Sequence, residues 1–327
     1  MSGWSGAWRI VGAGVAFLLV LTGTAGSAAA VVRVRAAAPG PSAIETSGLA
    51  ASGRWESSLG AEILVPAEWN ENDLGCLSTN HPSIVRYPRL EFACASEEQP
   101  TKEVAILADT AADDPGVVGR AVEVDGVPAV RSEWRKDDGR YAGTIDVPSR
   151  GVAVAVRTLD ATLTTGILDS FRLVPVDHAG CPERRPPEAA PVNLGAPATF
   201  VPAEPSAVVV CAYHTGNAYS TVDGRLRASW TATGADAVHL AELMNAAPAG
   251  ANPDPSAQVC TPQAPGGLDA ILLVRTNGPT ATVRVTFSSC TGRGLVNGSA
   301  RARVTMTLVR AIMAGIGGFT LRTELPD

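Results

Sequence analysis

The feature that most constrains this chain is an uncharged, apolar run near its amino terminus, Ile10–Val32. At about 1.5 Å of rise per helical residue, such a run is long enough to cross a hydrocarbon core of about 30 Å. The run also has the parts of a secretory signal, with Arg9 as a thin basic region and Ala28-Ala29-Ala30 as a cleavage site. We expect an uncleaved anchor, because the apolar residues continue through Val31-Val32 beyond that site. Secretion after cleavage near Ala30 is the alternative.

Both interpretations place residues 36–327 outside the cytoplasm, because either kind of segment exports the chain that follows it. We therefore expect a protein of the cell membrane, with one N-terminal anchor and extracytoplasmic domains. The expected partners are the membrane itself, through residues 10–32, and an envelope protein or wall polymer. Nucleic acid is not expected, since the net charge is −6, the sequence pI is about 5.3 and aromatic residues make up 5% of the chain.

Six cysteines in an exported chain predict three disulfides. Their spacing favours three local pairs, which are Cys76 with Cys94, Cys181 with Cys211, and Cys260 with Cys290. Metal ligation by these cysteines is the competing interpretation, and the absence of a CxxC motif and of closely spaced histidine pairs speaks against it.

The chain length predicts two domains after the export segment. Residues 1–35 form the anchor or signal, and residues 36–53 are small, Pro-, Gly- and Ser-bearing residues typical of a flexible linker. Residues 54–177 contain short runs with strand character and the turn Asp125-Gly126, which is typical of a hairpin. An amphipathic helix follows from Asp160 to about Phe171. This domain is expected to be an antiparallel sheet covered by a helix.

A Pro-rich junction, residues 178–191, separates that domain from the second, residues 192–327. The second domain contains two strand-strand-helix passes. The first pass ends in a helix that a capping box of Thr233 and Asp236 opens, and the second has its hairpin at Asn277-Gly278 and a helix from about Arg301 to Ala314. We therefore predict an α+β protein of two domains, the second built on a four-stranded antiparallel sheet with two helices on one face.

The residues that could carry chemistry form no catalytic, cofactor or metal motif. The four histidines are His81, His178, His214 and His239, and no two of them have the spacing of helical metal ligands. One candidate for a catalytic dyad is His239 with Glu242, but a solvated helix face explains these two residues as well. A metal could be held by His178 with Cys181, but a disulfide at Cys181 is the other explanation. A cation could be bound by the carboxylates Asp109, Asp113 and Asp114, but these residues also fit a turn. No catalytic, cofactor-binding or metal residue is therefore predicted.

Two sets of short motifs resemble exported or membrane-anchored actinobacterial proteins of unknown function. The first set is Arg54-Trp55-Glu56-Ser57-Ser58, Ile63-Leu64-Val65-Pro66-Ala67-Glu68-Trp69 and Cys76, and the second is Cys211-Ala212-Tyr213, Leu243-Met244-Asn245, Cys260, Cys290 and Val296-Asn297-Gly298. The resemblance implies location and architecture and supplies no functional residues. The V-P-x-x-W motif at Val65–Trp69 and the I-L-x-S-F motif at Ile167–Phe171 also resemble the Mog1/PsbP sandwich, a likeness that implies a fold for residues 54–177 and no function.

The sequence thus leads to an extracytoplasmic, disulfide-stabilised binding or structural protein of the bacterial cell envelope. Two alternatives stay open. One is an extracytoplasmic enzyme, such as a hydrolase, whose residues converge from loops without a recognisable motif. The other is a sensor or regulator of a membrane partner, which requires the anchor to be retained.

Overall fold

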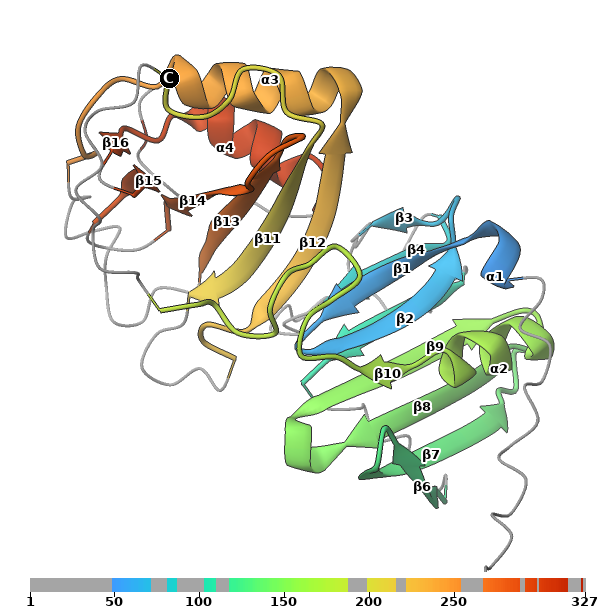
Figure 1. Cartoon of the computed structure of the whole chain (residues 1–327). Coiled ribbons are helices and arrows are strands. Elements are labelled where there is room, and N and C mark those ends of the chain that lie inside the picture. The colour runs from blue at the N-terminus through green and yellow to red at the C-terminus, as the bar shows by residue number, and fades with distance from the viewer. Residues whose placement is uncertain are drawn as a thin grey trace, which may run out of the picture. The chain divides into compact units, whose positions relative to one another are not determined.

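The computed structural model describes residues 49–71, 81–86, 103–109, 118–187, 199–215, 222–253, 267–288, 292–298, 300–316 and 325. Residues Glu45–Asp327 form one compact unit. The described part is rich in strands, which form three sheets with a few helices (Figure 1). The predicted α+β class is confirmed at this level. The predicted anchor or signal helix lies outside the described residues, and none of the helices within them is long and apolar enough to span a membrane.

A seven-stranded sheet forms the centre of the first half of the chain, with the order β3-β4-β5-β9-β8-β7-β6. Its strands are β3 (Asn70–Glu71), β4 (Ser83–Arg86), β5 (Val104–Ala108), β6 (Arg120–Val124), β7 (Val127–Arg135), β8 (Tyr141–Val147) and β9 (Val152–Thr158). The hairpin predicted at Asp125-Gly126 is confirmed, since it joins β6 to β7. The expectation of a purely antiparallel sheet is wrong at one edge, where β3, β4 and β5 run parallel.

A three-stranded sheet and helix α2 (Ala161–Asp169) pack on the seven-stranded sheet and enclose one hydrophobic core. The strands of the small sheet are β1 (Gly53–Ser58), β2 (Ala61–Pro66) and β10 (Arg172–Leu173). The short helix α1 (Leu49–Ser52) packs Leu49 against this core, and η1 (Pro148–Arg150) joins β8 to β9. The predicted amphipathic helix is confirmed. Asp160 accepts a hydrogen bond from the Thr162 backbone N–H at 2.7 Å, and Ile167 and Leu168 are buried.

A six-stranded antiparallel sheet organises the second half, with the order β12-β11-β13-β14-β15-β16. Its strands are β11 (Ala207–Thr215), β12 (Leu226–Thr233), β13 (Gly267–Arg275), β14 (Ala281–Thr286), β15 (Gly294–Asn297) and β16 (Ala300–Ala302). Helices α3 (Gly234–Asn245) and α4 (Met306–Met313) share one core with this sheet. The other face of the sheet buries a smaller cluster that includes Cys211, Tyr213 and Ile271.

Three expectations for the second half are wrong. The sheet has six strands instead of four, because β15 and β16 form a further hairpin at its edge. The last helix begins at Met306, since Ala300–Ala302 pair with β15 and cannot also be helical. The capping box is absent, because Thr233 occupies the N-cap position of α3 without a side-chain cap hydrogen bond. The cap exists on α4 instead, where the Thr305 hydroxyl accepts from the Leu308 backbone N–H.

Candidate functional site

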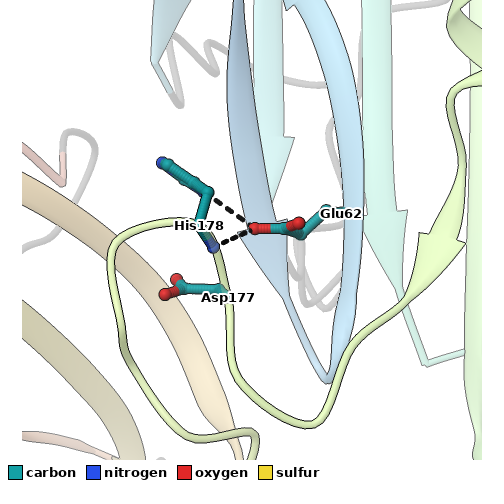
Figure 2. Close-up of side chains that lie close together, drawn as sticks. All are labelled: Glu62, Asp177 and His178. Carbon is teal, nitrogen blue, oxygen red and sulfur yellow. Dashed lines mark hydrogen bonds and ion pairs between the residues drawn. The ribbon is translucent and has the colours of Figure 1, made fainter.

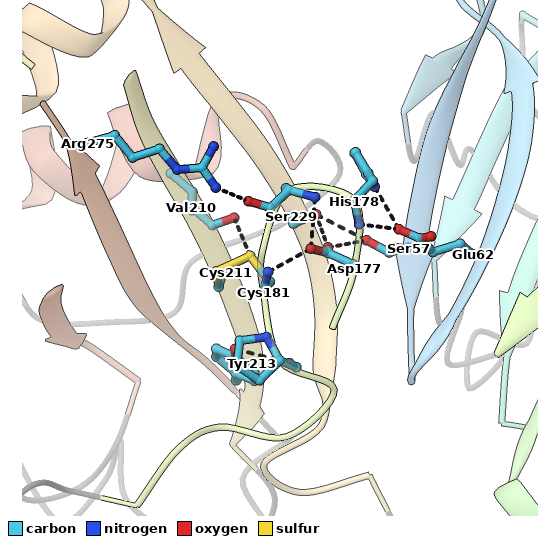
Figure 3. Close-up of a disulfide and its surroundings, with 12 residues drawn as sticks. Ser57, Glu62, Asp177, His178, Cys181, Val210, Cys211, Tyr213, Ser229 and Arg275 are labelled. Carbon is cyan, nitrogen blue, oxygen red and sulfur yellow. Dashed lines mark hydrogen bonds and ion pairs between the residues drawn. A yellow bond between two sulfur atoms is a disulfide. The ribbon is translucent and has the colours of Figure 1, made fainter. Parts of the chain in front are cut away.

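A disulfide ties the segment between β10 and β11 to the six-stranded sheet. We call residues 174–187 the connecting segment. Its Cys181 forms a disulfide with Cys211 of β11, with an S–S distance of 2.01 Å, and both residues are fully buried (Figure 3). This predicted pair is confirmed. The other four predicted disulfide residues, Cys76, Cys94, Cys260 and Cys290, lie outside the described residues.

Asp177 is the hydrogen-bond centre of the connecting segment. One carboxylate oxygen, Oδ1, accepts from the backbone N–H groups of Ala179 at 3.0 Å and of Cys181 at 2.7 Å. The other, Oδ2, accepts from the hydroxyl of Ser57 in β1 at 2.7 Å and from the hydroxyl of Ser229 in β12. Asp177 is 6% exposed and is therefore a buried side chain. Through Ser57 and Ser229, its carboxylate connects the three-stranded sheet to the six-stranded sheet (Figure 3).

Glu62 of β2 is the second carboxylate of the cluster and is fully buried. Figure 2 shows its two contacts with His178. Its Oε1 accepts from the backbone N–H of His178 at 2.6 Å and lies 2.8 Å from the ring Nδ1 of the same residue. Its Oε2 accepts from Arg172 through Nε at 2.9 Å and Nη2 at 2.6 Å. The Arg172 guanidinium also stacks over the ring of Trp55, 3.9 Å from its centre.

The two partners shift each other's pKa in opposite directions. Burial alone would raise the pKa of Glu62, but the hydrogen bonds from His178 and Arg172 outweigh it and hold that pKa below its ordinary value. Burial alone would lower the pKa of His178, but the hydrogen bond to Glu62 and the nearby charge of Asp177 raise it. The two side chains therefore favour a carboxylate and an imidazolium in contact.

Glu62, Asp177 and His178 bring their ligand atoms within 4.8 Å of one another, which raises the question of a metal site. A metal needs lone pairs that face the ion. Each of the four carboxylate oxygens in this cluster instead faces N–H or O–H donors of the protein. The geometry fits a hydrogen-bonded structural cluster and does not fit a cation, and we propose no metal here.

The other candidate residues do not join this cluster. The disulfide, which the sequence favoured over a metal held by His178 and Cys181, takes up the Cys181 sulfur, and His178 contacts Glu62. His239 and Glu242 are both exposed on α3. Asp109 follows β5, whereas Asp113 and Asp114 lie outside the described residues.

The remaining histidines belong to the framework. The His81 carbonyl accepts from the Ser83 hydroxyl at 2.9 Å, next to the start of β4. His214 is buried in β11, where its backbone N–H donates to the Arg225 carbonyl at 2.9 Å. Neither contact brings a histidine to Glu62 or Asp177.

Arg225 makes a second buried connection between the halves of the chain. Its Nη1 donates to the Gly151 carbonyl at 2.7 Å and its Nη2 donates to the Leu59 carbonyl. Glu183 of the connecting segment lies 3.4 Å from the same Nη2. Burial lowers the pKa of Arg225, and the nearby Glu183 opposes that shift.

A third ionic group lies between β1 and β4. The Arg86 side chain is fully buried and contacts Glu56 at 2.8 Å as well as Glu71. Arg54 contacts Glu56 at 2.5 Å from the other side. Burial raises the pKa of Glu71, although Arg86 acts against the rise. In this group too, carboxylates and guanidinium groups neutralise each other inside the fold.

Sequence reasoning missed the roles of Asp177 and Glu62. The stretch from Asp177 to Cys181 reads DHAGC, and an aspartate three residues before a glycine is a turn signal that could have identified the loop. Glu62 carries no comparable signal. Comparison with protein-family models, with curated proteins and with solved structures finds no match to this chain.

Proposed function

We propose that this chain is an extracytoplasmic, disulfide-stabilised binding or structural protein of the bacterial cell envelope. One observation carries the proposal. The cluster of Glu62, Asp177 and His178 uses both oxygens of each carboxylate for internal hydrogen bonds. A general base or a nucleophile needs an atom that can reach a substrate, and this cluster offers no carboxylate oxygen for that role.

The disulfide supports the proposed compartment. Disulfides persist in oxidising compartments and are rare in the cytosol, and Cys181–Cys211 forms here with both residues buried. The apolar run at residues 10–32 supports export independently. We propose that this run stays as a transmembrane anchor, with release after cleavage near Ala30 as the alternative. The proposed partners are the membrane and an envelope protein or wall polymer.

We further propose that the described unit consists of two domains, residues 54–177 and 192–327, joined by residues 178–191. The distribution of strands supports this division, because β1–β10 form two sheets and β11–β16 form a third, and within the described residues no strand of one group belongs to a sheet of the other. The anchor would come first and be followed by the linker expected at residues 36–53, whose last residues, 49–53, form α1 and the start of β1 in the structure.

The alternative of a hydrolase draws on one contact. Glu62 holds Nδ1 of His178 at 2.8 Å, as a carboxylate orients the base of a catalytic triad, and the imidazole is 33% exposed. The hydroxyls of Ser57 and Ser229 in this cluster bond to Asp177 and are buried, so neither is presented to a substrate as a nucleophile. The third possibility, a sensor or regulator of a membrane partner, requires the anchor to be retained, whereas the leading proposal also allows release after cleavage near Ala30.

Labelling of intact host cells tests the proposed location. Lys102 and Lys136 are the chain's two lysines, so a membrane-impermeant amine reagent should label Lys136 before the cells are broken. A Lys136→Arg variant identifies that peptide, and the absence of label on a cytoplasmic protein of the same cells controls for leakage. Labelling at Lys136 only after lysis would refute an extracytoplasmic location.

Co-sedimentation with purified walls and with membranes then separates binding from hydrolysis. We expect saturable co-sedimentation that the His178→Gln substitution leaves unchanged, because His178 has a structural role. Soluble fragments released by the parent protein, and not by His178→Gln, would favour the hydrolase. Absence of saturable binding to either material would contradict the binding function.

A further inference from the structure

The chain contains two Asn-Gly pairs that the fold holds in different ways. Asn277-Gly278 lies in the connection between β13 and β14, and Asn297-Gly298 lies where β15 turns into β16. In an unfolded chain the two dipeptides would have similar reactivity, because both place an unhindered glycine amide next to an asparagine side chain. A difference between them in the folded protein therefore comes from the structure.

Asn277 is exposed and lies outside the strand ladder. Among the described residues, no hydrogen bond holds its side chain. The Gly278 backbone N–H donates only to the Thr276 hydroxyl, at 3.0 Å, which is a local and exposed contact. Pro279 follows and cannot donate a ladder hydrogen bond. The Asn277 side chain can thus rotate towards the Gly278 nitrogen without breaking a bond of the fold.

Asn297 is held at three points. It pairs with Ala300 in the ladder between β15 and β16. Its side-chain Nδ2, the group that deamidation would expel, donates to the Phe200 carbonyl. Gly298 has a φ of 57°, so the following peptide is fixed in a tight turn. Rotation of this side chain towards its neighbour requires the loss of these contacts.

We propose that Asn277 is a site of spontaneous deamidation in the folded protein and that Asn297 is protected from it. The Gly278 amide nitrogen, after losing its proton to base, attacks Cγ of Asn277. The new C–N bond closes a succinimide, and the Asn277 Nδ2 leaves as ammonia after taking a proton. Water then opens the ring at either carbonyl and yields aspartate or isoaspartate.

The reaction consumes one water, releases one ammonia and needs no oxidant or enzyme. Its product carries one additional negative charge at the β13–β14 connection. The isoaspartate form also lengthens the backbone there by one carbon. The deamidated fraction at Asn277 would therefore increase with the age of each protein molecule.

Peptide mapping of the aged protein tests the proposal. The full-length protein is incubated under native conditions at mildly alkaline pH, and the asparagine, aspartate and isoaspartate forms of both peptides are quantified over time. We expect Asn277 to convert about tenfold faster than Asn297 or more, since the protected site must first lose the hydrogen bond to Phe200 and its turn. In denaturant, the two sites should convert at similar rates.

A Gly278→Ala variant provides the matched control. A Cβ at Gly278 would meet only the Thr276 hydroxyl, at 3.6 Å, and the backbone there has no positive φ, so the substitution should leave the fold intact. The added methyl group hinders the attacking nitrogen and should slow the conversion of Asn277 alone. Equal native rates at the two sites, or a faster Asn297, would overturn the proposal, as would an unchanged rate in Gly278→Ala.

Discussion

At the scale of single residues, buried charges in this protein are held by opposite charges and backbone groups. Glu62 illustrates the arrangement, because a fully buried carboxylate would be strongly unfavourable without the donors of Arg172 and His178. The run Ala61–Val65, ended by Pro66, predicts the strand β2. Nothing in that run predicts that Glu62 is buried, because its partners come from residues more than a hundred positions away. Local sequence patterns do not encode such contacts.

The contact between Glu62 and His178 predicts a pH dependence of stability. The pKa of His178 is raised, so its contribution is fully present below the ordinary value of 6.5 and is lost as pH rises through the folded-state value. The pKa of Glu62 is lowered, so its contribution is present above 4.5 and is lost as pH falls through the folded-state value. Arg172, Asp177 and Glu56 are the other charged groups that act on this pair.

Replacement of His178 by Gln should therefore lower stability most between about pH 5 and 6.5. We expect a loss of about 0.5–1 kcal/mol there, the range of a partly exposed charge pair, and a smaller loss above pH 8. Urea unfolding of both proteins across this pH range measures the difference. His239→Gln, on the exposed face of α3, is the control and should show no such profile. A constant difference at every pH would contradict the assigned charge pair.

At the scale of elements, two hairpins have nearly the same turn but different surroundings. Leu59-Gly60 joins β1 to β2 with φ values of 53° and 76°, and Asp125-Gly126 joins β6 to β7 with 49° and 77°. The sequence predicted the second turn, because Asp-Gly favours positive φ at both positions. It did not predict the first, since a leucine rarely adopts positive φ. Leu59 is fully buried, and its backbone N–H donates to the Leu226 carbonyl at 2.8 Å, so tertiary contacts fix this turn.

Alanine at Gly60 should destabilise the protein more than alanine at Gly126. Both substitutions carry the strain of positive φ, about 1–2 kcal/mol. A Cβ at Gly60 would also lie 2.5 Å from the Glu183 side chain, whereas a Cβ at Gly126 meets nothing within 4 Å. Glu183 contacts Arg150 and Arg225, so its displacement should add about 1–3 kcal/mol. Chemical denaturation measures the free energy of unfolding of the two variants. Equal losses of stability would contradict the contact between the Gly60 turn and the Glu183 side chain.

The strands and helices that the sequence predicted correctly are those with a local signal. Helix α2 has an apolar stripe and an N-cap. Strands β7 and β8 are bounded by turn residues, and their sequences include alternating apolar and polar residues. Strand β1 was missed, because its sequence GRWESS has no apolar alternation and its position depends on β2. Strand β16 was assigned to a helix for a related reason, since its three residues form a strand only next to β15. Long-range pairing, which a single sequence does not show, decided both cases.

At the scale of the whole molecule, the connecting segment links the three-stranded sheet to the six-stranded sheet. The predicted pairing of Cys181 with Cys211 fixes this segment on β11, and Asp177 extends the connection to Ser57 in β1 and Ser229 in β12. The sequence indicated the disulfide through spacing and compartment. It did not indicate the carboxylate, because neither serine is near Asp177 in the chain. The candidate site was thus predicted only in its covalent part.

The most direct test of this account is the stability of the Asp177→Asn variant, measured by urea unfolding. An asparagine has one carbonyl oxygen where Asp177 uses two, so we expect a loss of about 1–3 kcal/mol. Asp236→Asn in the exposed first turn of α3 is the matched control and should change stability by less than about 0.5 kcal/mol. A catalytic carboxylate commonly lowers the stability of its fold, and its neutralisation then stabilises the protein. Unchanged or increased stability of Asp177→Asn would contradict the structural role and reopen the enzyme interpretation.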